Sequence, residues 1–275
     1  MWLCLAAAVA AAPQFTSQVN LVEVYATVTD SRGAAVTDLA REEFDVLEDG
    51  ERQQVTAFVA GDFPLAAAVA LDRSFSMDRE RLTAAKSAAR LFLGELRPED
   101  QAMVIAVGSE IQTVAPLSTG RAAQYRAVET LDRWGTTSLH DAIIAAIDHV
   151  QPARGRRALL LLSDGDDRYS RATAADALAR ARRADVLIYP IAVGERRVPL
   201  FAELAALTGG RSAHVRDVRT LPATMREIAR ELRHQYLLGY TPRRPLTETG
   251  EWRAIAVRVK RPGLTVRARD GYLVR

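Results

Sequence analysis

Four near-continuous apolar runs in the middle of the 275-residue chain constrain its fold most strongly. They are LAAAVAL at 65–71, AMVIAVG at 102–108, RALLLLSDG at 157–165 and DVLIYPIAVG at 185–194. Runs without polar alternation are typical of parallel strands that helices cover on both faces. Helix-like segments lie between them, such as 78–96 and 173–184. This order predicts right-handed βαβ units and an α/β fold with a doubly wound, mostly parallel sheet.

Both ends of the chain instead alternate apolar and polar residues, which is typical of half-buried strands. The alternation is clear at 20–30 and 252–262, and Asp49-Gly50 is a hairpin signal between two strand-like arms. Neither end is long enough to bury a core of its own. We therefore expect the two ends to pack together as one small β-sandwich, with the α/β domain inserted in it.

The first residues, MWLCLAAAVAAAP, resemble the end of a secretory signal peptide. The only cysteine, Cys4, lies in this leader, so the mature chain has no thiol for a disulfide or a metal site. We expect a secreted, periplasmic or cell-envelope protein without membrane insertion of the mature chain. Its predicted parts are a signal peptide at 1–12, an N-terminal β segment at 13–62, an α/β domain at 63–234 and a C-terminal β segment at 235–275.

The charge pattern argues against a nucleic-acid partner. The chain has 37 basic and 34 acidic residues, a net charge of +3, and the two signs are spread along the same segments. It lacks a basic stripe with interleaved aromatic residues, which proteins that bind DNA or RNA usually have. We therefore predict that the chain does not bind nucleic acid.

Oxygen-bearing side chains follow the ends of the predicted strands. Asp72, Ser74 and Ser76 come after the first apolar run, Asp164 comes after another, and WGTTSLHDAI at 134–143 leads a threonine into a helix. Ligands of open α/β sheets bind at the carboxyl edge of the strands. Two carboxylates and three hydroxyls are hard ligands that suit Mg²⁺ or Mn²⁺. Such a cation would remain electrophilic enough to take an acidic ligand from outside.

These motifs resemble those of von Willebrand factor type A domains with a metal-ion-dependent adhesion site, as in secreted bacterial proteins of this type. The family motif D-x-S-x-S matches DRSFS, G-x-T-x-L-x-D-A-I matches the segment around Thr137, and T/S-D-G matches the segment around Asp164. The resemblance covers about residues 63–234. It implies that the divalent cation is held by Asp72, Ser74, Ser76, Thr137 and Asp164.

Two positions qualify this match. Phe75 stands where many family members carry a small residue. Thr136 competes with Thr137, although Thr137 fits the register of the motif better. A purely structural alternative is that the two serines cap a helix beginning near Asp78 and that Asp164 sits in a turn with Gly165.

Other polar residues near these motifs receive lesser roles. The four histidines, which include His140, show no ligand spacing, so none is assigned to the metal. Asp141 is expected to orient the loop. Phe75, Trp134 and Tyr169 lie within a few residues of proposed ligands and are expected to contact a partner, unless Phe75 turns into the core.

The resemblance implies a non-catalytic extracytoplasmic adhesion module that captures a carboxylate of a partner protein through the metal. A structural role in a cell-envelope assembly is the alternative, and the oligomeric state is open. A magnesium-dependent, phosphatase-like hydrolase is a further alternative. Aspartyl-phosphate phosphatases have a second carboxylate two residues after the first, where this chain has Ser74. The chain also lacks the G-x-S-x-G, phosphate-loop and H-E-x-x-H motifs.

Overall fold

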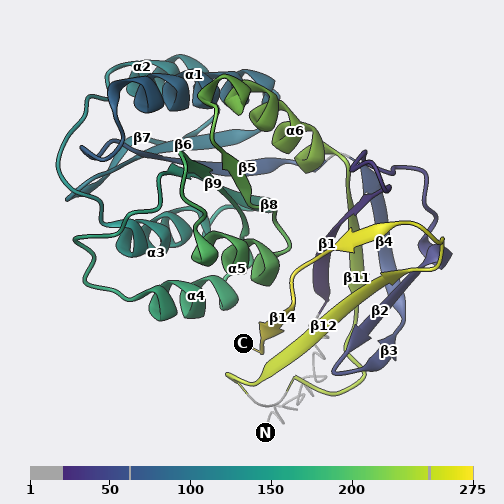
Figure 1. Cartoon of the computed structure of the whole chain (residues 1–275). Coiled ribbons are helices and arrows are strands. Elements are labelled where there is room, and N and C mark those ends of the chain that lie inside the picture. Colours follow the sequence, from purple (N-terminus) through teal and green to yellow (C-terminus); the bar gives the residue numbers. More distant parts are fainter. Residues whose placement is uncertain (1–20, 62, 247–248, 275) are drawn as a thin grey trace, which may run out of the picture.

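An α/β unit and a β-sandwich lie side by side in the structure, a computed structural model that describes residues 21–61, 63–246 and 249–274 (Figure 1). The expected signal peptide and Cys4 lie outside these residues. The sandwich contains strands from both ends of the described chain, and the α/β unit is formed by the segment between them. The predicted fold class, with an α/β domain inserted in a terminal sandwich, is confirmed.

A six-stranded sheet forms the centre of the α/β unit. Its strands are β5 (Leu65–Asp72), β6 (Gln101–Val107), β7 (Ile111–Ser118), β8 (Arg156–Ser163), β9 (Leu187–Val193) and β10 (Ala213–Val215). The spatial order is β10-β9-β8-β5-β6-β7, and every pair is parallel except β6 with β7. The four apolar runs form the four inner strands. The edge strand β7 is missing from the prediction because it is largely exposed and contains Pro116.

In the described ranges, six helices cover this sheet in two layers. They are α1 (Arg79–Glu95), α2 (Arg121–Glu129), α3 (Leu139–Val150), α4 (Ala174–Arg182), α5 (Pro199–Thr208) and α6 (Leu221–Arg233). Helices α1, α2 and α6 contribute to the core on one face, and α3, α4 and α5 to the core on the other. Val69 and Leu71 of β5 belong to the first core, whereas Ala68 and Ala70 belong to the second. No helix among the described residues is long and apolar enough to cross a membrane.

The sandwich consists of two antiparallel sheets. Its strands are β1 (Val22–Thr29), β2 (Phe44–Glu48), β3 (Glu51–Gln53), β4 (Val55–Gly61), β11 (Gln235–Tyr240), β12 (Trp252–Val259), β13 (Thr265–Arg267) and β14 (Gly271–Leu273). One sheet has the order β13-β1-β11-β4 and the other β14-β12-β2-β3. Short 3-10 turns occur at Arg41–Glu43 and Val218–Thr220. Because each sheet contains strands from both chain ends, neither end can complete the shared core alone.

The predicted hairpin at Asp49-Gly50 is confirmed, with one difference. Both residues have positive φ, 49° and 87°, which suits an Asp-Gly turn between β2 and β3. The second strand-like arm does not continue as one strand. It divides into β3, which pairs with β2, and β4, which pairs with β11 in the opposite sheet.

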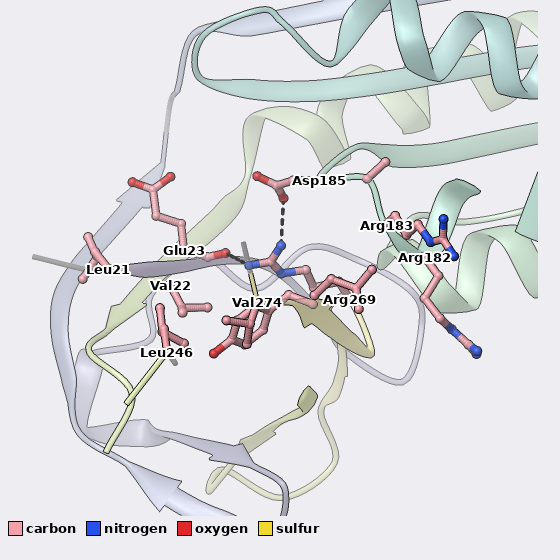
Figure 2. Close-up of a pocket in the computed structure, with 12 residues that line it drawn as sticks. Leu21, Val22, Glu23, Arg182, Arg183, Asp185, Leu246, Arg269 and Val274 are labelled. Atoms are coloured by element: carbon pink, nitrogen blue, oxygen red, sulfur yellow. Dashed lines mark hydrogen bonds and ion pairs between the residues drawn. The ribbon is translucent and has the colours of Figure 1, made fainter. Parts of the chain in front are cut away.

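A pocket of about 330 Å³ marks the junction between the two units (Figure 2). Arg269 reaches across this junction: its guanidinium donates to the backbone oxygen of Glu23 at 2.7 Å and lies 3.3 Å from Asp185 (Figure 2). Nearby, a Cβ on Gly209 would lie only 2.6 Å from the backbone of Ala268, and Gly209 has a φ of +80°. The sandwich therefore docks closely on the end of α5.

A buried arginine joins the two places where the chain crosses between the units. Arg156 is 1% exposed and donates to the backbone oxygen of Phe63 at 3.1 Å and to the side chain of Gln235 at 3.2 Å. Gln235 in turn donates to the Thr27 hydroxyl at 2.9 Å. Both crossings are thus held by one side chain from the start of β8.

Candidate metal centre

The candidate ligands lie at the carboxyl edge of the central sheet. Asp72 is the last residue of β5, and Asp164 follows the last residue of the neighbouring parallel strand β8. Strand β5 starts directly after β4 of the sandwich, so its carboxyl end lies at the edge of the sheet away from the sandwich (Figure 1). The site edge is therefore free of the sandwich.

Asp72 is a fully buried carboxylate held by two hydrogen bonds. Its exposure is 0%, its Oδ1 accepts from the Ser74 backbone N–H at 2.9 Å, and its Oδ2 accepts from the Ser163 hydroxyl at 2.6 Å. The Ser163 hydroxyl also accepts from the Gly165 backbone N–H at 3.0 Å. Ser163 was not selected from the sequence. The only signal was its place between an apolar run and Asp164.

Burial, and to a smaller extent the neighbouring charge of Asp164, raise the pKa of Asp72 from 3.8 to about 6. Hydrogen bonds from Ser163 and Ser74 act in the opposite direction. Desolvation is the largest cause, as expected for a carboxylate taken out of water. Among the described residues, no arginine or lysine forms an ion pair with Asp72. The site is therefore an electronegative, partly desolvated pair of carboxylates.

The two serines of DRSFS turn toward each other. Their hydroxyl oxygens are 2.9 Å apart, Ser74 is buried and Ser76 is exposed. The alternative in which they cap the next helix is not seen, because Asp78 caps α1 by accepting from the Arg81 backbone N–H at 2.8 Å. The two hydroxyls therefore contact each other rather than the end of the helix.

Asp164 does form the turn that the structural alternative describes. Its Oδ1 accepts from the Asp166 backbone N–H at 3.1 Å, and Gly165 has a φ of +77°. A Cβ on Gly165 would lie 2.2 Å from a methyl group of Val198, so glycine is required there. This turn fixes the loop beside Asp72, and it is compatible with a second role for the carboxylate.

Thr137 is 2% exposed and lies in a loop tied to the neighbouring loop. Its backbone oxygen accepts from the N–H groups of Arg168 and Tyr169, both at 3.0 Å. The competing residue, Thr136, is exposed, and its hydroxyl is 3.1 Å from that of Ser109. The Thr136 hydroxyl thus already has a partner in Ser109.

Asp141 and Asp167 link the start of α3 to the loop that follows β8, and each accepts hydrogen bonds from the other segment. Asp167 accepts from the Leu139 N–H at 2.7 Å, at the start of α3. Asp141 accepts from the N–H groups of Arg171 and Ala172, both at 2.9 Å. Asp167 was missed from the sequence because its partner Leu139 lies 28 residues away. His140 contacts Asp167 at 3.4 Å and the Ala172 backbone oxygen at 3.2 Å, so it also links these two segments.

Three aromatic side chains lie exposed near these loops. Phe75 is 60%, Trp134 40% and Tyr169 63% exposed. Phe75 therefore does not turn into the core. In the part of the chain that the structure describes, no three His, Cys, Asp or Glu side chains gather as a metal-binding cluster. Any metal here would depend on hydroxyls as well as carboxylates.

Comparisons with known proteins agree with this architecture. A family model described as the von Willebrand factor type A domain matches residues 68–166. A von Willebrand factor type A protein from Catenulispora acidiphila is 16% identical, with a TM-score of 0.55 over 84% of this chain and 74% of that chain. The vWF domain of the type V pili tip protein Mfa5 from Porphyromonas gingivalis is 11% identical, with a TM-score of 0.53 over 62% of this chain and 95% of that chain.

A third solved structure carries a metal. Proximal thread matrix protein 1 from the mussel byssus, with a zinc-occupied MIDAS motif, is 16% identical, with a TM-score of 0.56 over 68% of this chain and 50% of that chain. No curated protein matches the chain. At these identities the likeness shows the fold alone. The family match and the shared fold together support a von Willebrand factor type A domain in the α/β part of the chain.

Proposed function

We propose that the chain is a non-catalytic, extracytoplasmic protein-binding module that captures an acidic group of a partner protein through a divalent cation, Mg²⁺ or Mn²⁺. The side chains that would hold the cation are Asp72, Ser74, Ser76, Thr137 and Asp164. One observation carries this proposal: Asp72 is a buried carboxylate beside a second carboxylate, with no cationic side chain paired to it among the described residues. A buried charge in this situation normally requires a counter-ion.

The donor set fits a hard divalent cation. All candidate donors are carboxylate or hydroxyl oxygens, which suit Mg²⁺ and Mn²⁺ better than softer metals. Two carboxylates balance the charge of the cation, whereas the hydroxyls of Ser74 and Ser76 add none. When bound, the cation supplies an electrophilic centre for an oxygen of an external acidic group. Ser163 and the Ser74 backbone N–H orient the Asp72 carboxylate, so its geometry is set before any ligand arrives.

The comparisons support the functional class and the location. One structural neighbour is a pilus tip domain, and another is a byssus protein with a zinc-occupied MIDAS motif. Type A domains generally mediate interactions rather than catalysis. In this chain Ser74 also stands where aspartyl-phosphate phosphatases carry a second carboxylate. We therefore infer binding, rather than phosphate-ester hydrolysis, as the role of this strand edge.

The proposal is tested by titrating Mg²⁺ and Mn²⁺ into the protein by calorimetry. Asp164→Asn should weaken binding by more than about tenfold, because it removes one of the two charges that neutralise the cation. Asp166→Asn is the matched control, since Asp166 is a neighbouring carboxylate outside the proposed set. Equal affinity of the wild type and Asp164→Asn would refute the metal assignment.

The two adjacent threonines provide a second, independent prediction. Thr137→Val should weaken Mg²⁺ binding by about tenfold, because valine keeps the shape of the side chain and removes the proposed oxygen donor. Thr136→Val should leave the affinity unchanged, since the Thr136 hydroxyl contacts Ser109. The same calorimetric titration measures both variants. A loss confined to Thr136→Val would move the ligand to the other threonine.

A further inference from the structure

Two arginine side chains stack on exposed aromatic rings beside the candidate metal centre. The Arg73 guanidinium lies 5.1 Å from the centre of the Trp134 ring, and the Arg133 guanidinium lies 5.7 Å from the centre of the Phe75 ring. Phe75 is 60% and Trp134 40% exposed. We call these four side chains the arginine–aromatic platform. Phe75 lies between the two proposed serine ligands, so the platform adjoins the proposed metal site.

Backbone hydrogen bonds hold the two loops of the platform together. The Trp134 N–H donates to the Arg73 oxygen at 2.7 Å, and the Phe75 N–H donates to the Gly135 oxygen at 3.0 Å. The Arg133 guanidinium also donates to the Phe75 oxygen at 2.5 Å. These hydrogen bonds therefore join the loop that contains Arg73 and Phe75 to the loop that contains Arg133 and Trp134. The platform is ordered before a ligand arrives, which lowers the entropic cost of binding.

Two glycines make room for this arrangement. A Cβ on Gly108 would lie 2.9 Å from the Trp134 backbone oxygen and 3.2 Å from its ring. A Cβ on Gly135 would lie 2.6 Å from the Ser109 hydroxyl, and Gly135 has a φ of +73°. Trp134 thus packs on a surface that only glycine leaves open. The exposure of this ring results from a specific local structure.

The platform carries positive charge that the described residues do not neutralise. Neither Arg73 nor Arg133 forms an ion pair with a carboxylate in the described ranges. Arg73 instead donates to the side-chain oxygen of Gln112 at 3.3 Å. Asp72, which precedes Arg73, is buried and accepts from Ser74 and Ser163, whereas Glu110 and Asp132 are exposed and Glu110 accepts from Gln112. A guanidinium stacked on a ring keeps donors at its edge, which suit a planar carboxylate.

We propose that the arginine–aromatic platform binds a second carboxylate of the partner, so that the partner offers an acidic peptide segment rather than a single acidic side chain. The proposal rests on the function proposed above, in which a first acidic group occupies the metal centre. Aromatic and arginine side chains are the residues most often found at protein-binding hot spots. The charge of the platform and its position beside the metal centre favour an acidic segment that spans both.

The test uses two fluorescein-labelled Gly-Ser peptides of equal length, one with a single aspartate and the other with several. Fluorescence anisotropy measures their binding in Mg²⁺. We expect the wild type to bind the second peptide about tenfold more tightly, the gain expected from an added charge-assisted hydrogen bond. The double variant Arg73→Gln/Arg133→Gln should bind both peptides equally.

The control variant is Arg243→Gln/Arg258→Gln, which removes the same charge from exposed positions of the sandwich. It should keep the preference for the acidic peptide. Thermal unfolding checks that each variant is folded, and the single variant Arg73→Gln replaces the double one if that fails to fold. If Arg73→Gln/Arg133→Gln still binds the peptide with several aspartates more tightly, the proposal is wrong.

A further variant separates this inference from the proposed function. Asp72→Asn should weaken binding of both peptides. If it changes neither affinity while the platform variant still loses its preference, the metal function fails and the acidic-peptide site stands. Competition by an oligothymidylate as effective as that by the acidic peptide would identify a phosphate site and overturn the proposal.

Discussion

Replacing Glu48 with leucine is expected to lower the free energy of unfolding by about 3 kcal/mol, because it removes the buried one of the two carboxylates that pair with the Arg253 guanidinium, the other being the more exposed Glu251. Arg253 is 1% exposed, and its Nη1 lies 3.1 Å from the Glu48 carboxylate. Glu48 also accepts from the hydroxyls of Tyr240 at 2.8 Å and Tyr272 at 2.9 Å. Burial, and then Glu48, raise the pKa of both tyrosines, so their hydroxyls stay protonated and donate.

Urea unfolding followed by circular dichroism measures this loss. Glu51→Leu is the matched control, because Glu51 lies on the neighbouring strand, is exposed, and should change stability by less than about 0.5 kcal/mol. The double variant Glu48→Leu/Arg253→Met should recover most of the loss, since a buried pair replaced by apolar residues no longer contains an unpaired charge. Equal stability of the single and double variants would contradict this account.

Asp72→Asn is expected to stabilise the metal-free protein at pH 7 by about 2 to 3 kcal/mol while abolishing its response to Mg²⁺. The folded protein holds a proton on Asp72 more tightly than the unfolded chain does, because burial raises the pKa of this group from 3.8 to about 6. The contribution of Asp72 to stability is therefore present at low pH and lost as pH rises from about 4 to about 6. Asparagine avoids the cost of the buried charge.

Urea unfolding in a chelator, between pH 4 and pH 7, measures the difference between the two proteins. The gap should be largest at pH 7 and disappear near pH 4. Added Mg²⁺ should stabilise the wild type and leave Asp72→Asn unchanged, because binding to the folded state alone raises its stability. A variant that is less stable than the metal-free wild type at pH 7 would contradict the account.

Much of the fold was predictable from the sequence because burial on both faces leaves a simple pattern. The inner strands β5, β6, β8 and β9 are apolar except near their ends, and the turn at Asp49-Gly50 needs the positive φ that these residues tolerate. Strand β7 lacks such a pattern because half of its side chains are exposed and only one is buried. Hydrogen bonds to β6 hold β7 as a strand, although its amino-acid composition does not indicate one.

The inner face of β12 shows how a sequence pattern can contain a hidden pair. Arg253 and Ile255 are two residues apart in β12, so their side chains point to the same face of the sheet. The alternation therefore places a charge on the buried face. On β2, the side chain of Glu48 likewise points to the same face as those of Val46 and Phe44. Two opposite charges on inward positions of two strands could have indicated a buried pair, although the pairing of β12 with β2 was not predictable locally.

The candidate centre was only partly predictable. The sequence motifs predicted the ligands Asp72, Ser74, Ser76, Thr137 and Asp164. The structure brings the segments that carry them to one sheet edge. Ser163 and Asp167 were not selected, because a serine at the end of a strand and an aspartate in a loop have no distinctive local pattern. Their roles depend on neighbours distant in sequence, such as the contact of Ser163 with Asp72.

The double crossing between the two units has a mechanical consequence. The α/β unit joins the sandwich through β4 and β11, which are hydrogen-bonded neighbours with Gln235 opposite Gly61. Tension applied between the α/β unit and the chain at Val22 would pull β11 from Gln235 and β1 from Val22, which pairs with Tyr240 at the opposite end of the β1–β11 ladder. The ladder between β1 and β11 would then be loaded in shear, with its hydrogen bonds sharing the force. Resistance to force is set by the unfolding rate, so this arrangement of strands would slow the forced unfolding of the sandwich.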